Sequence, residues 1–162
     1  MPACSVHNAP AMRELREAEA ARRVINGESL LCEGIAGTGK THYVQGLVQE
    51  LRALGRTVAI ISKTHTASQR AGGATADHWI RRNVIHGCAA ADTAWVDECF
   101  QIETELWAQL NKLSGRQWIF SGDASQFPPL FDSWRAAPIA EDAFQRSQLL
   151  LTLCGCNRLP LP

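Results

Sequence analysis

The chain has 162 residues, which is long enough for one domain with a substantial hydrophobic core. Its 16 lysine and arginine residues balance 16 aspartate and glutamate residues, so the formal net charge is zero. Because the protein has no overall positive charge to attract a nucleic acid, any contact with a nucleic acid must come from a local group of basic or polar side chains. No apolar run approaches the roughly 20 residues of a membrane span, and residues 1–8 lack the charged and apolar blocks of a signal peptide. We expect an intracellular protein without membrane contacts, in the cytoplasm or the nucleus, and an origin in a virus or a mobile element remains open.

Helical and strand-like patterns alternate along the chain. Residues 40–54 carry apolar side chains at the spacing of one helix face, and residues 57–62 form a β-branched apolar run that is typical of a buried strand. In chain order, the patterns predict helices over 11–23, 40–54, 76–85, 102–113 and from 141, and strands over 29–32, 57–62, 93–96, 117–121 and 149–153. This alternation predicts an α/β fold in which helices cover both faces of a parallel sheet.

The first motif lies between the strand at 29–32 and the helix at 40–54, and it fits the pattern G-x-x-x-x-G-K-[ST]. Such a loop binds phosphate, because its backbone N–H groups turn inward and the following helix adds its positive end. Lys40 can reach the terminal phosphates, and the Thr41 hydroxyl can hold Mg²⁺. The Gly37-x-Gly39 pair is also found in dinucleotide-binding turns, but Lys40 and Thr41 argue against such a site, because that turn needs a further glycine rather than a lysine. The predicted nucleotide-binding residues are Gly34, Ile35, Ala36, Gly37, Thr38, Gly39, Lys40 and Thr41.

Two further motifs also follow predicted strands. Asp97 and Glu98 end the strand at 93–96, where the first acid can bind Mg²⁺ and the second can orient or deprotonate an attacking water. The segment Gly122–Pro129 follows the strand at 117–121, and its Gln126 amide can sense a γ-phosphate. Because ligands of parallel sheets bind at the carboxyl ends of strands, we expect all three motifs at one edge of the sheet.

The six cysteines include no C-x-x-C pair. We expect reduced thiols, with Cys32 and Cys99 acting as small hydrophobic residues. Cys154 with Cys156, or His86 with Cys88, leaves a zinc site as an alternative without the usual ligand spacing. Trp79 can stack on a base or pack in the core beside Ile80, and the helical pattern favours the core.

Taken together, the ordered motifs resemble superfamily 1 DNA helicases, on the side of the Pif1, RecD and Dda helicases. Gly34–Thr41 is similar to motif I, Val96–Glu98 to motif II and Gly122–Pro129 to motif III, with Phe127 in place of leucine. Ser62–Ala67 resembles motif Ia, although Ser62 and Lys63 replace the usual Ala-Pro. Weaker matches are Gly73–His78 and the start of motif IV at Cys156–Leu159.

The resemblance implies a RecA-like P-loop NTPase lobe that uses ATP and Mg²⁺ and moves on single-stranded DNA, with RNA as an alternative. Residues 1–28 would be a helical lead-in and 29–162 the first motor lobe, which works with a second RecA-like lobe in cis or in trans. The roles that it implies are nucleotide binding by residues 34–41 and Asp123; catalysis by Lys40, Asp97, Glu98, Gln126 and Arg158; metal binding by Thr41 and Asp97; and DNA binding by Thr64, His65, Thr75 and His78.

Two other functions account for part of the sequence. A P-loop kinase or small-molecule NTPase explains motifs I and II, but not Gly122–Pro129 or the Thr64-His65 pair. The other alternative is a truncated, non-catalytic module that binds nucleotide or a partner. It is supported by the fact that the second lobe and its arginine finger are not among these 162 residues. No adenine-reading glutamine precedes the P-loop in the sequence, so the base preference is not assigned. We expect the isolated lobe to bind nucleotide and to hydrolyse it slowly.

Overall fold

A parallel sheet forms the centre of the computed structural model, which describes residues 11–63, 73–85, 91–113, 116–127, 129, 132–140 and 147–162. Its seven strands lie in the order β1-β9-β2-β6-β5-β3-β4, and every neighbouring pair is parallel. The strands are β1 (Arg13–Glu14), β2 (Leu30–Glu33), β3 (Val58–Ser62), β4 (Ala74–Thr75), β5 (Thr93–Asp97), β6 (Gln117–Gly122) and β9 (Asn157–Pro160). The predicted α/β fold with a parallel sheet is therefore confirmed.

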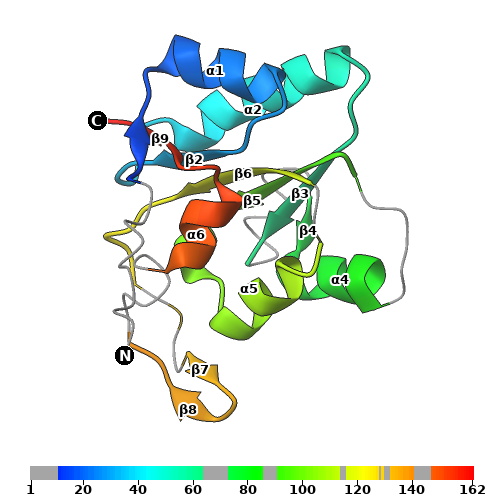
Figure 1. The fold of residues 1–162 in the computed structure, drawn as a ribbon, viewed down its shortest axis with the longest axis vertical. Helices are drawn as coiled ribbons and strands as arrows, with labels where there is room; N and C mark the ends of the chain where they lie inside the picture. Colours follow the sequence, from blue (N-terminus) through cyan, green and yellow to red (C-terminus); the bar gives the residue numbers. More distant parts are fainter. Residues whose placement is uncertain are drawn as a thin grey trace, which may run out of the picture.

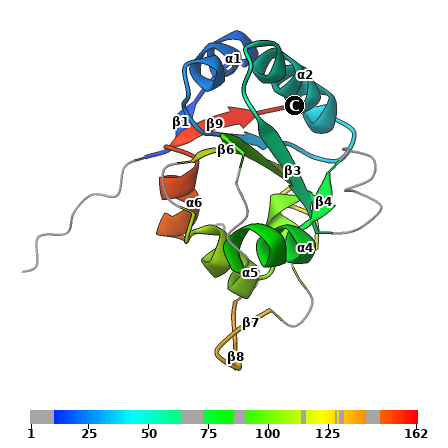
Figure 2. The same cartoon turned by 90° about the vertical axis from the view of Figure 1, so that its right-hand side faces the viewer.

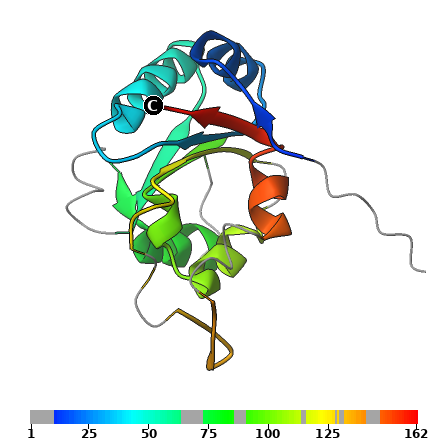
Figure 3. The same cartoon turned by 90° about the vertical axis from the view of Figure 1, so that its left-hand side faces the viewer.

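Helices cover both faces of this sheet (Figures 1 and 2). One layer consists of α1 (Glu17–Ile25) and α2 (Lys40–Ala53). The opposite layer holds α4 (Ala76–Ile80), which continues as a π-helical turn over Arg81–Ile85, together with α5 (Thr104–Leu110) and α6 (Gln148–Leu153). A short 3₁₀ turn, Cys99–Gln101, connects β5 to α5. In the view of Figure 3 the sheet separates the two layers, and the chain ends beside the start of α2.

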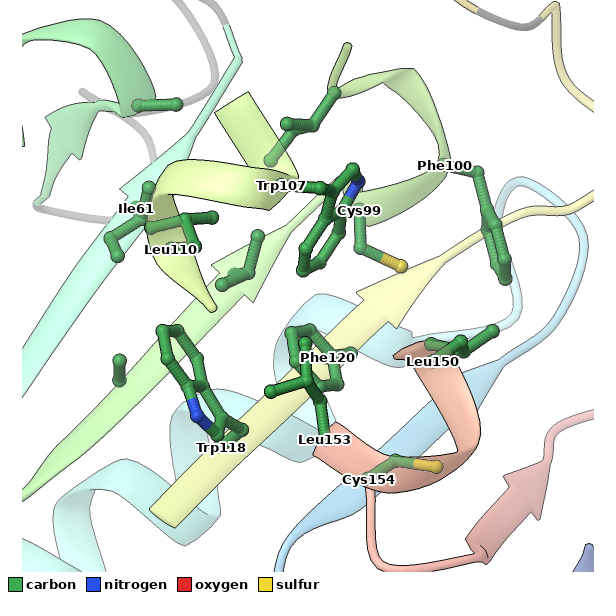
Figure 4. Close-up of a cluster of buried hydrophobic side chains, with 14 of the residues drawn as sticks. Ile61, Cys99, Phe100, Trp107, Leu110, Trp118, Phe120, Leu150, Leu153 and Cys154 are labelled. Atoms are coloured by element: carbon green, nitrogen blue, oxygen red, sulfur yellow. The ribbon is translucent and has the colours of Figure 1, made fainter. Parts of the chain in front are cut away.

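An aromatic cluster fills the space between the sheet and the layer of α4, α5 and α6 (Figure 4). The rings of Trp118 and Phe120 stack with their centroids 5.8 Å apart, and Trp107 of α5 meets Phe120 edge-on at 5.3 Å. Phe120 is completely buried at the centre of this cluster. Trp79 belongs to the same core, so the expectation that it packs beside Ile80 is confirmed.

The predicted strand at 149–153 is wrong, because these residues form helix α6. A short apolar run suits either structure, and here the Ser147 hydroxyl accepts a hydrogen bond from the backbone N–H of Leu150 and so caps a helix start. The true last strand is β9, where the buried Asn157 side chain donates to the carbonyl of Ser29 and to Glu28. These bonds fix the first residue of β9 beside the residue before β2.

The predicted helix at 11–23 begins later than expected, at Glu17. Arg13 and Glu14 instead form β1, which pairs with β9 at Asn157 and Arg158. An unpredicted hairpin joins β7 (Ser133–Trp134) to β8 (Ala137–Pro138). The helix expected from Glu141 starts outside the described residues.

Cys32, Cys99 and Cys154 are free and buried, which confirms the expectation for the first two. In the described part of the chain, no group of three or more histidine, cysteine, aspartate or glutamate side chains gathers closely enough to hold a metal ion by itself. His86 and Cys88 lie outside that part. Among the helices that the structure describes, none has the length and apolar character to cross a membrane.

Phe120→Ala should lower the free energy of unfolding by about 3–5 kcal/mol, because it leaves a cavity among Trp107, Trp118 and the sheet. Phe127→Ala is the matched control, since this phenylalanine is 90% exposed and its loss should change stability by less than about 0.5 kcal/mol. Urea denaturation of both variants measures the difference. Equal effects of the two substitutions would contradict the position of Phe120 in the core.

Candidate active site

The parallel register brings the three main motifs to one edge of the sheet. Glu33 at the end of β2 pairs with Gly122 at the end of β6, and Asp97 at the end of β5 pairs with Ser62 at the end of β3. The backbone N–H of Gly34 donates to the carbonyl of Gly122 at 3.3 Å. The loop of residues 34–39, the acidic pair at the end of β5 and the segment at the end of β6 therefore meet where parallel sheets bind ligands.

Two glycines determine the shape of the loop between β2 and α2. A Cβ atom on Gly34 would lie 2.7 Å from Thr38 Oγ1 and 2.9 Å from the carbonyl oxygen of Leu161, so no larger residue fits without displacing backbone. Gly39, the residue before α2, has a φ of 86°, a left-handed conformation that costs other residues roughly 1 kcal/mol or more. The loop is thus compact and ends directly on the positive terminus of a 14-residue helix.

Lys40 places its ammonium group over this loop. Its Nζ donates to the carbonyl oxygens of Gly34 and Ile35, both at 2.7 Å, and the side chain is largely buried. Burial raises the pKa of Glu98, and the lysine charge opposes that rise; hydrogen bonds from Ser125 lower the pKa of Asp123, and the lysine charge adds to that fall. A buried cation at a helix start, surrounded by short backbone turns, is suited to bind a phosphate chain.

Asp97 is buried at the end of β5, where it accepts a hydrogen bond of 2.6 Å from the Ser121 hydroxyl. Glu98, the next residue, adopts a left-handed conformation with φ of 53°. Burial, and then the charge of Asp97, raises the pKa of the Glu98 carboxyl above its usual range. A raised pKa makes a carboxylate a stronger base, which suits a residue that activates water.

Asp123 and Gln126 lie on the turn after β6. One oxygen of the Asp123 carboxylate accepts from both the hydroxyl and the backbone N–H of Ser125, and these bonds lower the pKa of Asp123. A backbone N–H of the loop, from Ala36, contributes to the same shift. Gln126 accepts a hydrogen bond of 2.7 Å from the Gln101 side chain. The structure thus links this turn both to the phosphate-binding loop and to the segment after Glu98.

The residues of this edge fit a hydrated divalent cation. Asp97 supplies a carboxylate, and Thr41 supplies a hydroxyl in the first turn of α2. Ser62, which pairs with Asp97, is fully buried, and its Oγ makes no hydrogen bond with the residues that the structure describes. Oxygen donors of this kind suit Mg²⁺, which retains several waters when proteins bind it.

The remaining predicted site residues lie farther from the loop. Thr75 ends β4, next to Ser62, and its Oγ1 accepts from the backbone N–H of His78 at 3.4 Å. His78 is exposed and lines a hollow of about 470 Å³ with Arg82 and the first residues of β3, away from the P-loop edge. Thr64 and His65 lie outside the described residues.

Arg158 lies on β9, beside the loop rather than over it. Its guanidinium donates to Glu33 at 2.8 Å and to Glu14 at 3.3 Å. It lines a pocket of about 360 Å³ with residues 33–35 and 123–125. In this arrangement two carboxylates hold the arginine at the wall of the site.

Several residues of the site carry no motif signal. Ser121 and Gln101 hydrogen-bond to the motif side chains Asp97 and Gln126, and Trp95 hydrogen-bonds to Ser121. In the sequence these three residues look like ordinary strand or loop residues. Strand alternation does place Trp95 on the same face as Asp97. Lys63, which replaces the proline expected in motif Ia, forms an ion pair with Glu103.

A family model described as an AAA domain matches residues 16–138, more than half of the chain. No curated protein matches the sequence.

Among solved structures, the Pif1 helicase from Candida albicans superimposes with a TM-score of 0.68 at 20% identity, covering 90% of this chain and 38% of that one. Bacteroides Pif1 bound to ssDNA matches with a TM-score of 0.56 at 16% identity over 72% of this chain. Bacteroides sp Pif1 in complex with ADP-AlF4 matches with 0.56 at 17% identity over 75%. The chain spans 34% and 35% of these two Bacteroides chains. The fold is therefore that of a RecA-like P-loop lobe.

Glu98→Gln removes a half-buried charge while conserving side-chain size. Because the pKa of Glu98 is raised in the folded protein, its ionised form destabilises the fold at pH values above the unfolded pKa, and protonation removes this penalty as the pH falls. The variant should melt at a higher temperature than the wild type at about pH 7, and this difference should shrink towards about pH 4, near the ordinary glutamate pKa. Calorimetric scans at both pH values measure it, with the exposed Glu50→Gln as control. A difference that does not change with pH would contradict the environment assigned to Glu98.

Proposed function

The chain belongs to the AAA-domain family, and from this premise we propose that it is the ATP-binding lobe of a helicase that couples ATP hydrolysis to movement on single-stranded DNA. The observation that carries the proposal is the buried Lys40 ammonium over a glycine loop, at the same sheet edge as Asp97 and Glu98. The Pif1 structures share this fold, and two of them contain single-stranded DNA or ADP-AlF4. The chain spans 38% of the Candida albicans Pif1 chain, which matches the proposal that it is one lobe of a larger helicase.

Each residue has a defined part in the proposed reaction. The loop N–H groups and Lys40 bind the β- and γ-phosphates, where Lys40 exchanges its two carbonyl acceptors for phosphate oxygens. Thr41 and Asp97 hold Mg²⁺, which neutralises charge on the phosphates when bound. Glu98 accepts the proton of the attacking water, consistent with its raised pKa.

The turn after β6 would report the state of the nucleotide. Its carboxylate, Asp123, is connected to the loop through Ala36, and Gln126 is hydrogen-bonded to Gln101. The Gln126 amide group can donate to a γ-phosphate oxygen or to the attacking water. Loss of the γ-phosphate would release that contact and change the position of the turn. Arg158 would contribute by moving from Glu33 to the γ-phosphate, a change that the proposal requires of this side chain.

Lys40→Ala should weaken binding of Mg²⁺-ATP by at least about thirtyfold, since loss of a buried charged partner costs about 2 kcal/mol or more. Lys112→Ala is the matched control, because this lysine is exposed at the end of α5 and contacts Gln109. Calorimetric titration of both variants and the wild type gives the affinities, and circular dichroism verifies folding. Unchanged affinity in a folded Lys40→Ala protein would overturn the nucleotide-binding assignment.

The double variant Thr75→Ala, His78→Ala should bind oligo-dT about threefold to thirtyfold more weakly, because each lost hydrogen bond to phosphate contributes about 1 kcal/mol. Arg22→Ala serves as control, since this arginine is exposed on α1, in the other helix layer. Fluorescence anisotropy over a range of salt concentrations measures both affinity and its salt dependence, which should be steep. An equal loss in the Arg22 variant would show that the contact is diffuse rather than located at β4 and α4.

A further inference from the structure

We propose that Trp95 and Ser121 are positioning residues that hold one oxygen of Asp97, so that its other oxygen faces the hydrated divalent cation of the bound nucleotide. The inference rests on the proposed function, because it assigns Asp97 to the cation. It adds two residues on the central strands that touch neither nucleotide nor metal.

The three side chains form a continuous buried hydrogen-bond chain. The indole Nε1 of Trp95 donates to Ser121 Oγ at 2.7 Å, and the same hydroxyl donates to Asp97 Oδ1 at 2.6 Å. Trp95 and Ser121 have no exposed surface, and Asp97 is 6% exposed. Water therefore does not compete for these bonds, and each of them is stronger than at the surface.

The direction of these hydrogen bonds follows from the donors that are present. An indole nitrogen can only donate, so Ser121 must accept from Trp95. The hydroxyl has one hydrogen, and the geometry assigns it to Asp97 Oδ1. Without Trp95 the hydroxyl could rotate, and without Ser121 both the indole N–H and Oδ1 would lose their partner in a buried place.

The backbone explains why these residues meet. Trp95 and Asp97 are two apart on β5 and so lie on the same face. Ser121 follows Phe120 on β6, which pairs with Val96 of β5, and this register places the serine opposite Asp97. These bonds thus tie the carboxylate to both central strands through Oδ1. Among the residues that the structure describes, no hydrogen bond engages Asp97 Oδ2, which would accept from a metal-bound water. Removal of a residue that hydrogen-bonds to a metal ligand, without itself touching the metal, typically lowers metal affinity by 10- to 100-fold.

The test measures the Mg²⁺ requirement of nucleotide binding in the 162-residue chain. Binding of ADP is titrated without metal, in EDTA, and then with increasing Mg²⁺. Ser121→Ala should raise the Mg²⁺ concentration for half-maximal enhancement by roughly tenfold, and Trp95→Phe by a few fold, while affinity in EDTA stays the same. Trp118→Phe is the matched control, because it makes the same change at a buried tryptophan of β6 on the other face of the sheet. Its Mg²⁺ requirement should not change.

A spectroscopic measurement on the wild type avoids any loss of stability in the variants. With ¹⁵N-labelled tryptophan, the Trp95 indole signal is assigned by its absence in Trp95→Phe. Addition of Mg²⁺ to the ADP-bound protein should shift this signal and leave that of Trp118 in place.

The outcomes separate the two proposals. If the wild type binds ADP and Mg²⁺ enhances the binding, but Ser121→Ala has an unchanged Mg²⁺ requirement, the positioning role is overturned and the proposed function stands. The same holds if Trp118→Phe changes the requirement as much as Trp95→Phe, or if Mg²⁺ leaves the Trp95 signal unmoved. A wild type that binds no nucleotide under either condition would overturn both.

Discussion

The parallel register of β2, β6 and β5 is the constraint on which the site depends. Because these strands run in the same direction and end together, the loop before α2, the acids after β5 and the turn after β6 occupy one edge. Strand alternation then directs Trp95 and Asp97 towards the layer of α1 and α2, where Lys40 begins its helix. A shift of one residue in the pairing would send Asp97 to the opposite face and separate it from the loop.

Much of this arrangement was predictable because its signals are local. The strand at Val58–Ser62 and the helix at Lys40–Ala53 have strong periodicity, and the phosphate-binding loop has a fixed pattern. The predicted strand at 149–153 was wrong because a leucine-rich run of this length fits a helix equally well. Only the Ser147 cap and the bonds of Asn157 to the start of β2 distinguish the two, and the second of these is a long-range contact.

The chemistry of the site divides in the same way. Lys40, Asp97, Glu98 and Gln126 were predictable because each follows a strand or a glycine loop. Ser121 was not, since its role depends on β6 lying beside β5 and on which face the serine occupies. The position of Arg158 also depends on tertiary structure, because Glu33 and Glu14 come from two other strands. Motif patterns identify the groups that we propose to react, whereas strand order determines which groups lie beside them.

The charges at this edge explain why a cation belongs to the proposed reaction. Burial raises the pKa of Glu98 most, the charges of Asp97 and Asp123 raise it further, and the charge of Lys40 opposes them. A nucleotide would add further negative charge at the same place, which one lysine and a helix terminus balance only in part. A divalent cation next to Asp97 relieves this repulsion, and it does so best if the carboxylate is already oriented. The buried bonds from Ser121 and Trp95 supply that orientation during folding, so that little of the binding energy is spent on ordering Asp97 when the nucleotide arrives.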